Sequence, residues 1–256
     1  MIKWKLMITT IPYVLFILGI KLILDFFLDF NGVLEFSEVG LILTGGIFIM
    51  GFMLAGTMAD YKESERMPGE IASVLETLED TIQVVCKNYP ALNEKEMKAK
   101  LLEVSKQIIP WLYKKITMED LFASLNSSLP IAGKMDQVGA SGFATRFLNE
   151  LSALRKIINR INVISITSFL QTGYALLEAL IFAIMAILIL SKFKNTIAEY
   201  TITAAACMIY FYLYRLIKDI DDPFEYVEAA AKGASEVELF PIEEYIERAK
   251  KRIDSL

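Results

Sequence analysis

The chain has 256 residues, of which 55% are hydrophobic and 22% charged, and its mean hydropathy of +0.45 is high for a soluble protein. Apolar blocks that alternate with charged blocks give this combination, which indicates membrane spans joined to a sizeable aqueous part. The net charge of −5, with no basic cluster, argues against a nucleic-acid partner. The sequence contains no histidine, which removes the commonest metal ligand and proton shuttle.

Residues 7–30 predict a first transmembrane helix, which follows a short basic stretch at residues 1–5. No small-residue cleavage site follows the apolar run, so we expect the helix to be retained. Lys21 and Asp25 are four residues apart and can pair near the far end of this helix. The alternative is that Lys21 extends its side chain to the membrane interface.

The uncharged stretch at residues 39–58 spans about 30 Å as a helix, which matches the hydrocarbon core of a bilayer. Thr44, Phe48 and Phe52 recur at every fourth position and therefore share one face. The small residues that let neighbouring helices approach closely include Gly45, Gly46, Gly51 and Ala55. We interpret the stretch as a pore-lining helix. The alternative is a glycine-rich packing helix with two core aromatics.

Four charged residues are expected at the outer mouth of such a pore. Glu35 and Glu38 lie just before the second helix, in a linker without lysine or arginine, which the positive-inside rule places outside. Lys192 and Lys194 lie in the short outer turn between the third and fourth helices. The lysines would attract anions and the glutamates would attract cations.

Residues 59–162 are rich in charge and contain no apolar run long enough to cross a membrane, so we expect a cytoplasmic helical region. Its first apolar stripe has helical spacing and consists of Ile71, Val74, Leu75, Leu78, Ile82 and Val85. Thr117 and Asp120 fit the pattern of a capping box, and residues 127–142 predict a loop. Ser141 begins a long helix with Phe147 and Leu151 on its apolar face. Since no alternating strand pattern competes, the fold class is all-α.

Residues 163–190 predict a third transmembrane helix and residues 200–216 a fourth, which leaves both termini in the cytoplasm. Glu178 lies within the third helix, and an intramembrane carboxylate is a candidate functional residue. The alternative is structural, with Gln171, Thr172 or Tyr174 as its hydrogen-bond partner.

The chain therefore divides into four segments. The first two transmembrane helices occupy residues 1–58, the cytoplasmic helical region residues 59–162, the last two transmembrane helices residues 163–216 and the cytoplasmic tail residues 217–256. The tail begins with acids whose oxygens could hold a cation, namely Asp219, Asp221, Asp222 and Glu225. We favour helix capping as their role and expect no cofactor; the alternative is that these acids bind calcium.

No phosphate-binding loop, nucleophile elbow, dinucleotide fingerprint or Cys/His cluster occurs, so we expect no enzyme. Two pairs of adjacent acids lie off the apolar stripes and are interpreted as solvated surface: Glu79 with Asp80, and Glu243 with Glu244. Cys86 and Cys207 fall in an aqueous and an apolar segment respectively, which argues against a disulfide.

The order of these segments resembles the bestrophin channels: two spans, a helical cytoplasmic block, two more spans and an acid–Pro–Phe tail. This order of segments covers the whole chain. Four local stretches are also similar to motifs of that family, and the residue matches cover about a third of the chain. They are Gly51-Phe52 with residues 58–68 (MADYKESERMP), residues 147–155 (FLNELSALR), residues 221–224 (DDPF) and residues 239–242 (LFPI). The chain departs from the family in lacking Arg-Trp-Trp after the second helix, in having Glu225 after Pro-Phe, and in lacking a dense acidic calcium clasp.

The resemblance implies a divergent prokaryotic member that forms a homopentamer, with five second helices around one pore. It places the narrow neck on Thr44, Phe48 and Phe52, the three positions that already share a face, and it favours chloride among small ions. It also implies a membrane protein whose partners are the bilayer, the permeant ions and other copies of itself. The lack of a cleavable signal suggests that the membrane is a prokaryotic inner membrane.

Three alternatives stay open. A cation-selective channel of the same fold would use Glu35 and Glu38. An ion-coupled transporter would use Glu178 with Lys21 and Asp25, and would need those groups to face a shared cavity. A non-conducting membrane scaffold would have a second helix buried in protein contacts, with Phe48 and Phe52 pointing away from any axis.

Overall fold

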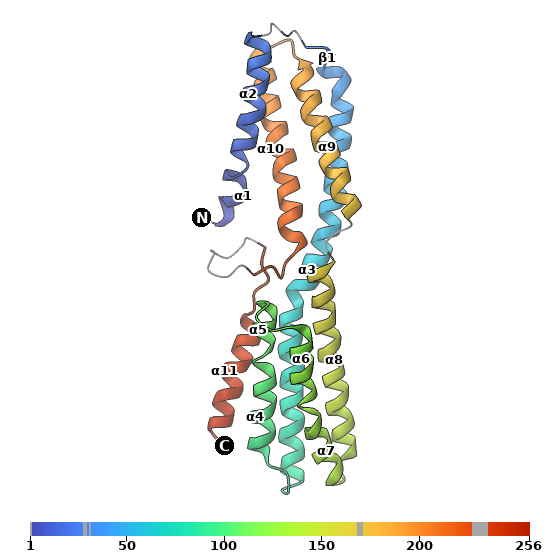
Figure 1. Ribbon diagram of the computed structural model, residues 1–256, viewed down its shortest axis with the longest axis vertical. Coiled ribbons are helices and arrows are strands. Elements are labelled where there is room, and N and C mark those ends of the chain that lie inside the picture. The colour runs from blue at the N-terminus through green and yellow to red at the C-terminus, as the bar shows by residue number, and fades with distance from the viewer. Residues whose placement is uncertain (1, 28–29, 31, 168–170, 227–234) are drawn as a thin grey trace. The chain divides into compact units, whose positions relative to one another are not determined.

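The computed structural model describes residues 2–27, 30, 32–167, 171–226 and 235–256 (Figure 1). These residues are mainly helical, with one pair of two-residue strands, and the chain divides into two compact units. Unit 1 comprises Met1–Tyr61 and Thr167–Asp222, and unit 2 comprises Lys62–Ile166 and Pro223–Leu256. Helix α3, Phe36–Asn88, begins in unit 1 and ends in unit 2.

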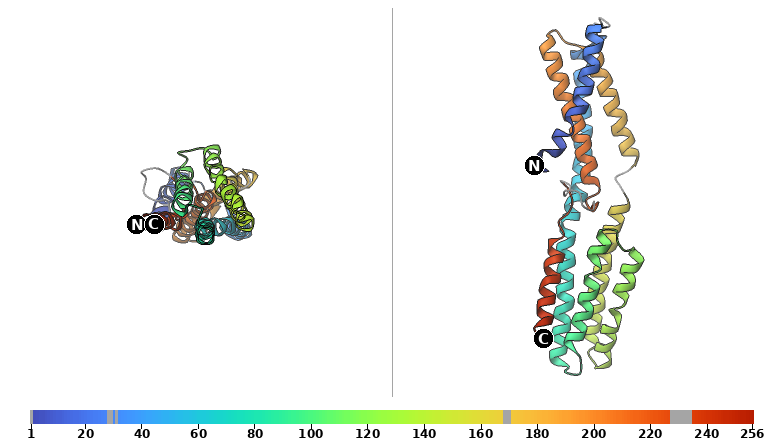
Figure 2. Two further views of the ribbon diagram at one scale, coloured as in Figure 1. Left: turned by 90° about the horizontal axis from the view of Figure 1, so that it is seen from below. Right: turned by 60° about the vertical axis from the view of Figure 1, so that its left-hand side comes forward.

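Unit 1 is a bundle of helices long and apolar enough to cross a membrane. Its elements are α1 (Ile2–Ile8), α2 (Ile11–Phe27), β1 (Leu34–Glu35), the first part of α3, α9 (Gln171–Leu190), β2 (Ser191–Lys192) and α10 (Thr196–Asp221). Among the described residues, four helices have the length and hydropathy of a span: Trp4–Phe27, Val39–Asn88, Thr172–Leu190 and Thr196–Asp221. In Figure 2, α2 and α10 lie side by side. The all-α fold with four transmembrane helices is thus confirmed.

The first transmembrane helix is interrupted near its start, which the sequence did not predict. Thr9 and Thr10 separate α1 from α2, and their hydroxyls donate to the carbonyls of Lys5 (2.9 Å) and Leu6 (2.8 Å). Pro12 follows directly and has no N–H to continue the helical hydrogen bonds. The break is therefore the combined effect of a proline and of two hydroxyls that satisfy the last carbonyls of α1.

The core of unit 1 depends on a close approach at Gly46. A Cβ atom at this position would lie 2.5 Å from Ile184 Cδ1 and 2.6 Å from the Tyr210 hydroxyl oxygen, so only glycine fits. The Tyr210 hydroxyl donates a hydrogen bond to the carbonyl of Leu43, which ties α10 to α3. The buried apolar side chains of this core are Val14, Ile17, Val39, Leu43, Met50, Leu177, Ile181, Ile184, Met185, Leu188, Cys207, Tyr210 and Ile217.

Unit 2 is a helical bundle around the second part of α3. Its other helices are α4 (Glu94–Ser105), α5 (Ile108–Leu112), α6 (Met118–Asn126), α7 (Leu129–Gln137), α8 (Ser141–Ile166) and α11 (Phe240–Asp254). The predicted stripe on α3 is buried at Ile71, Leu75, Leu78, Ile82 and Val85, and Val74 packs beside it. Phe147 and Leu151 of α8 are buried as expected. Periodicity thus identified the core of this unit.

Of two predictions about helix ends and loops in unit 2, one is confirmed and one is wrong. The capping box is present: the Thr117 hydroxyl accepts from the Asp120 N–H (3.1 Å), and the Asp120 carboxylate accepts from the Thr117 N–H (3.0 Å). The loop predicted at residues 127–142 is wrong, because α7 occupies Leu129–Gln137. Pro130 stands in the first turn of α7, where its missing N–H costs no hydrogen bond.

The predicted third span begins later than expected. Helix α8 continues to Ile166, and Ile164 is buried in the core of unit 2. The span itself is Thr172–Leu190 in α9. Residues 163–166 therefore belong to unit 2, and Ile164, one of the apolar side chains that suggested a membrane segment, is a core residue of that unit.

Each unit contains one free cysteine. Cys86 lies in unit 2 with its sulfur 3.8 Å from Met97 Sδ, and Cys207 lies in unit 1 with its sulfur 3.4 Å from Met185 Sδ. Both thiols are buried, and burial raises the pKa of Cys86 above its ordinary value. The two are not bonded to each other, as predicted.

Glu79 is not solvated surface, contrary to the sequence reading. Only 4% of the residue is exposed, and its carboxylate accepts two hydrogen bonds from Arg252 of α11, at 2.8 and 2.6 Å. The ammonium nitrogen of Lys98 on α4 lies 3.5 Å from the Glu79 carboxylate. The hydrogen bonds to Glu79 raise the pKa of Arg252. The adjacent Asp80 is exposed, as expected. Glu79 therefore links α3, α4 and α11.

Glu79→Ala should destabilise unit 2, because it leaves Arg252 and Lys98 without their shared carboxylate. Arg252 is 38% exposed and also lies near Glu76, and Lys98 keeps Glu94 at 2.8 Å, so the loss of the charge-assisted hydrogen bonds costs about 1–3 kcal/mol. We expect a lower thermal midpoint for the detergent-solubilised chain, measured by loss of helical circular dichroism. Asp80→Ala, the neighbouring exposed acid on the same helix, is the matched control and should change the midpoint little. Equal midpoints for the two variants would contradict the linking role of Glu79.

Candidate functional site

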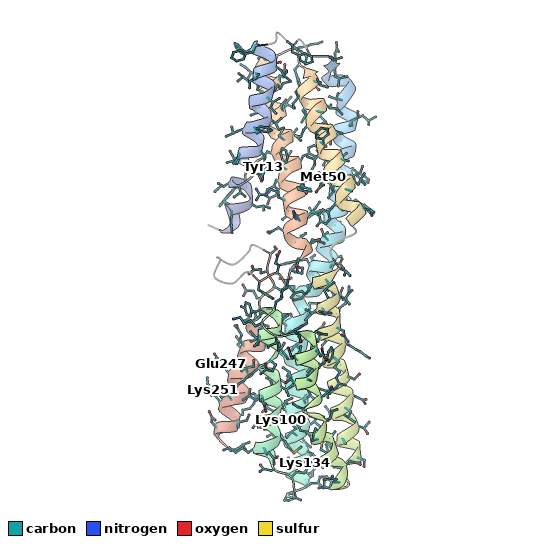
Figure 3. The ribbon with its side chains drawn as sticks, in the orientation of Figure 1. Tyr13, Met50, Lys100, Lys134, Glu247 and Lys251 are labelled. Atoms are coloured by element: carbon teal, nitrogen blue, oxygen red, sulfur yellow. The ribbon has the colours of Figure 1, made fainter. Side chains whose placement is uncertain are left out.

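Helix α3 has two different faces within unit 1. Val39, Leu43, Gly46 and Met50 are buried against the rest of the unit. Figure 3 labels Met50 on this helix. The opposite face is exposed and carries the three predicted neck residues, Thr44, Phe48 and Phe52. Phe48 is 73% exposed and Phe52 77% exposed, as much as other phenylalanines on the outer faces of unit 1 such as Phe182.

The polar group of Thr44 is already occupied by its own helix. Its hydroxyl donates to the carbonyl of Gly40 at 2.9 Å. Gly45 and Gly51 lie on the same exposed side, and apart from the adjacent residues and backbone of α3 itself, a Cβ atom at either position would meet no atom within 4 Å. Ala55 is also exposed. Of the four predicted packing residues, Gly46 is therefore the one that packs against other helices of the same chain, at Ile184 and Tyr210. The other three lie on the face that the chain leaves open.

Two of the predicted outer charges meet in the strand pair. β1 and β2 pair in parallel, with Leu34 opposite Ser191 and Glu35 opposite Lys192. Gly32 makes the pairing possible, because its φ of +64° and its closeness to Lys192 leave no room for a side chain. Lys194 is exposed nearby in the chain, and the side chain of Glu38 lies outside the described part of the structure. Glu35, which was expected to attract cations, and Lys192, which was expected to attract anions, are therefore neighbours in the strand pair.

Lys21 is wholly buried, so neither predicted role of this residue is correct. Its ammonium lies 2.8 Å from Glu199 of α10 and donates to the carbonyls of Ser191 (2.7 Å) and Leu188 (3.1 Å). It therefore neutralises a buried carboxylate and caps the end of α9, where helical carbonyls lack partners. Asp25 instead accepts a hydrogen bond from Tyr200 at 2.8 Å.

Glu178 has a partner that the sequence did not suggest. The hydroxyl of Tyr214 on α10 donates to its carboxylate at 2.8 Å. Both residues line a pocket of about 820 Å³ between α2, α9 and α10. Lys21 and Asp25 do not line this pocket, so the groups that a coupled transporter would need do not share it.

The comparisons with known proteins concern the fold. No protein-family model and no curated protein sequence matches this chain. The solved structure of a bacterial bestrophin homolog from Klebsiella pneumoniae matches 96% of this chain and 97% of its own, with a TM-score of 0.74 and 12% identity. A variant of that homolog matches 100% of this chain and 98% of its own, with a TM-score of 0.75 and 12% identity. A structure described as a membrane protein matches 98% and 99%, again at 0.75 and 12%.

The chain has a bestrophin-like fold. At this identity the similarity is one of backbone architecture, and it extends over both units. The resemblance found in the sequence is therefore confirmed at the level of the fold, from α1 to α11.

The sequence suggested a cation site at the acids that begin the tail. Among the described residues, no group of three or more His, Cys, Asp or Glu side chains could hold a metal ion. Asp219 and Asp221 are in the last turn of α10, and Asp222 and Glu225 follow it. The turn they occupy ends α10 just before Pro223, which is buried with Phe224.

Sequence reasoning missed three residues of unit 1: Glu199, Tyr214 and Arg215. Each contacts a partner far away in the sequence. Glu199 pairs with Lys21, Tyr214 donates a hydrogen bond to Glu178, and Arg215 lies over the ring of Tyr13. Glu199 alone carried a signal, since it is an acid beside the apolar span that begins at Tyr200. Such an acid needs a buried base, and Lys21 was the candidate.

Replacing Glu199 with Leu should destabilise unit 1, because Lys21 would remain charged in an apolar site. The expected cost is about 3–5 kcal/mol, which corresponds to a fall of roughly 10 °C in the thermal midpoint. The double variant Lys21→Met/Glu199→Leu should recover part of this loss, since no buried charge then remains. Recovery should stay incomplete, because Lys21 also caps the carbonyls of Leu188 and Ser191. Lys194→Met, at an exposed lysine, is the control. A double variant no more stable than the single one would contradict the pairing.

Proposed function

We propose that the chain is an ion channel in which the α3 helices of several copies surround one pore. The observation that supports this most directly is the pair of faces on α3. One face packs into unit 1, and the other exposes Thr44, Phe48 and Phe52 in a row. A helix built in this way can line a shared axis without giving up its own core.

The neck of the proposed pore is hydrophobic. In the homopentamer that the family resemblance implies, Phe48 and Phe52 together contribute ten rings facing the axis. A constriction of this kind can block ions by excluding water, without a separate plug. Gly45 and Gly51, where an added Cβ would meet no other element of the chain within 4 Å, would allow adjacent α3 helices to approach closely. The scaffold alternative, in which Phe48 and Phe52 point away from any axis, gives the exposed row on α3 no role in conduction.

Chloride is the ion that we propose, in line with the family resemblance and with Lys192 and Lys194 at the outer end. A cation-selective channel is the second candidate, because Glu35 stands opposite Lys192 in the strand pair and brings a negative charge to the same place. The proposed setting is a prokaryotic inner membrane, with both termini in the cytoplasm.

Phe48→Ala/Phe52→Ala should raise the conductance, because removing the rings widens and wets the neck. Single-channel current of the reconstituted protein measures the effect. Phe26→Ala/Phe27→Ala is the matched control: these are two α2 phenylalanines that are similarly exposed, at 78% and 80%. An unchanged current in a folded, oligomeric Phe48→Ala/Phe52→Ala variant would count against the neck.

Ion selectivity should follow chloride. Purified protein in liposomes, with chloride and potassium gradients imposed separately, should give a reversal potential that tracks the chloride gradient. A reversal potential that tracks potassium would keep the pore and favour the cation-selective candidate. No flux of either ion from an intact oligomer would overturn the channel proposal.

A further inference from the structure

The pocket in unit 1 has an apolar wall and a polar end. Its wall is formed by side chains from three helices: Phe16 and Ile17 of α2, Ile181, Phe182 and Met185 of α9, and Phe211 of α10. The stretch of α9 from Glu178 to Ile189, which lines it, is about 16 Å long at 1.5 Å per residue. A pocket of this length and polarity fits a hydrocarbon chain better than a compact polar molecule.

The polar residues gather at one end of the pocket. Tyr214, Arg215 and Lys218 come from the last two turns of α10, and Tyr214 holds Glu178 by a hydrogen bond. This end carries two positive charges and one negative charge. The apolar residues Ile20 and Ile189 also line the pocket, on the parts of α2 and α9 that lie towards β1 and β2.

Arg215 has unused hydrogen-bonding capacity here. Its Nη1 atom is buried and has no hydrogen-bond partner among the described residues. Its guanidinium carbon lies 5.8 Å from the ring centre of Tyr13, which holds the group over an aromatic face; Figure 3 labels Tyr13 on α2. A guanidinium keeps its charge at any physiological pH, and an unpaired buried N–H is costly. Phosphate oxygens are the acceptors that match this geometry best.

Glu178 narrows the choice of ligand. A carboxylate beside the two cations disfavours a ligand that is purely anionic, and it favours one that also carries a hydrogen-bonding cation. A trimethylated ammonium has no N–H to donate, whereas a primary ammonium has three. The charge pattern therefore matches a phosphate joined to a primary amine.

We propose that this pocket binds phosphatidylethanolamine. One acyl chain lies along the apolar wall, the phosphate binds Arg215 and Lys218, and the ammonium binds Glu178. The site does not depend on ion conduction, since it uses α2, α9 and α10 and none of the residues proposed for the neck. Its ligand comes from the membrane itself.

The test is lipid retention by the purified full-length protein after detergent exchange in the presence of equal amounts of phosphatidylethanolamine, phosphatidylcholine and phosphatidylglycerol. Bound lipid per chain is measured by mass spectrometry. We expect phosphatidylethanolamine to be retained in preference to the other two. Arg215→Gln/Lys218→Gln should weaken its binding about tenfold or more, because charge-assisted hydrogen bonds are lost. Lys5→Gln, at an exposed lysine of α1 that does not line the pocket, is the control.

Two further variants keep the test decisive if Arg215 proves necessary for folding. Ala186→Phe fills the apolar wall without changing any charge, and should abolish retention of all three lipids. Glu178→Gln should remove the preference for phosphatidylethanolamine over phosphatidylcholine while leaving binding itself in place. Equal retention of the three lipids by the unaltered protein would overturn the proposal. So would an absence of bound lipid because a second copy of the chain covers the pocket.

Discussion

The ion pair between Lys21 and Glu199 is the interaction on which unit 1 depends most. It joins three segments that are far apart in the sequence: the middle of α2, the end of α9 and the start of α10. A single ammonium there neutralises a carboxylate and satisfies carbonyls that α9 would otherwise leave without donors. In an apolar environment each of these groups alone would be expensive to bury. The pair also fixes β2, and through β2 the position of Glu35 beside Lys192.

Helix α3 shows how one segment serves two requirements. Its buried face is specific, since Gly46 admits Ile184 and Tyr210 at distances that no other residue allows. Its exposed face carries the aromatic side chains of Phe48 and Phe52, which are not buried against other helices of unit 1. Changes at Phe48 or Phe52 can therefore alter a pore without disturbing the bundle that holds it. On α3, the residues that stabilise the bundle are therefore different from the residues proposed to line the pore.

The features predicted correctly from the sequence depend on neighbours a few residues away. The stripe from Ile71 to Val85, the capping box at Thr117 and the four apolar spans all follow from local spacing and composition. The errors concern partners that only the fold brings together. Glu79 seemed solvated because Arg252 is distant in the sequence, and Lys21 seemed to need Asp25 because Glu199 is distant. Helix α7 was missed because a proline at a helix start resembles one in a loop.

The placement of the cysteines gives the protein a built-in reporter for each unit. Cys86 and Cys207 are the two thiols of the chain, one per unit, and each is buried with its sulfur in contact with a methionine sulfur. A thiol reagent in solution reaches either one only when its own unit opens locally. Identifying which cysteine is modified first would therefore rank the opening rates of the two units in the intact, unlabelled chain. No engineered probe would be needed.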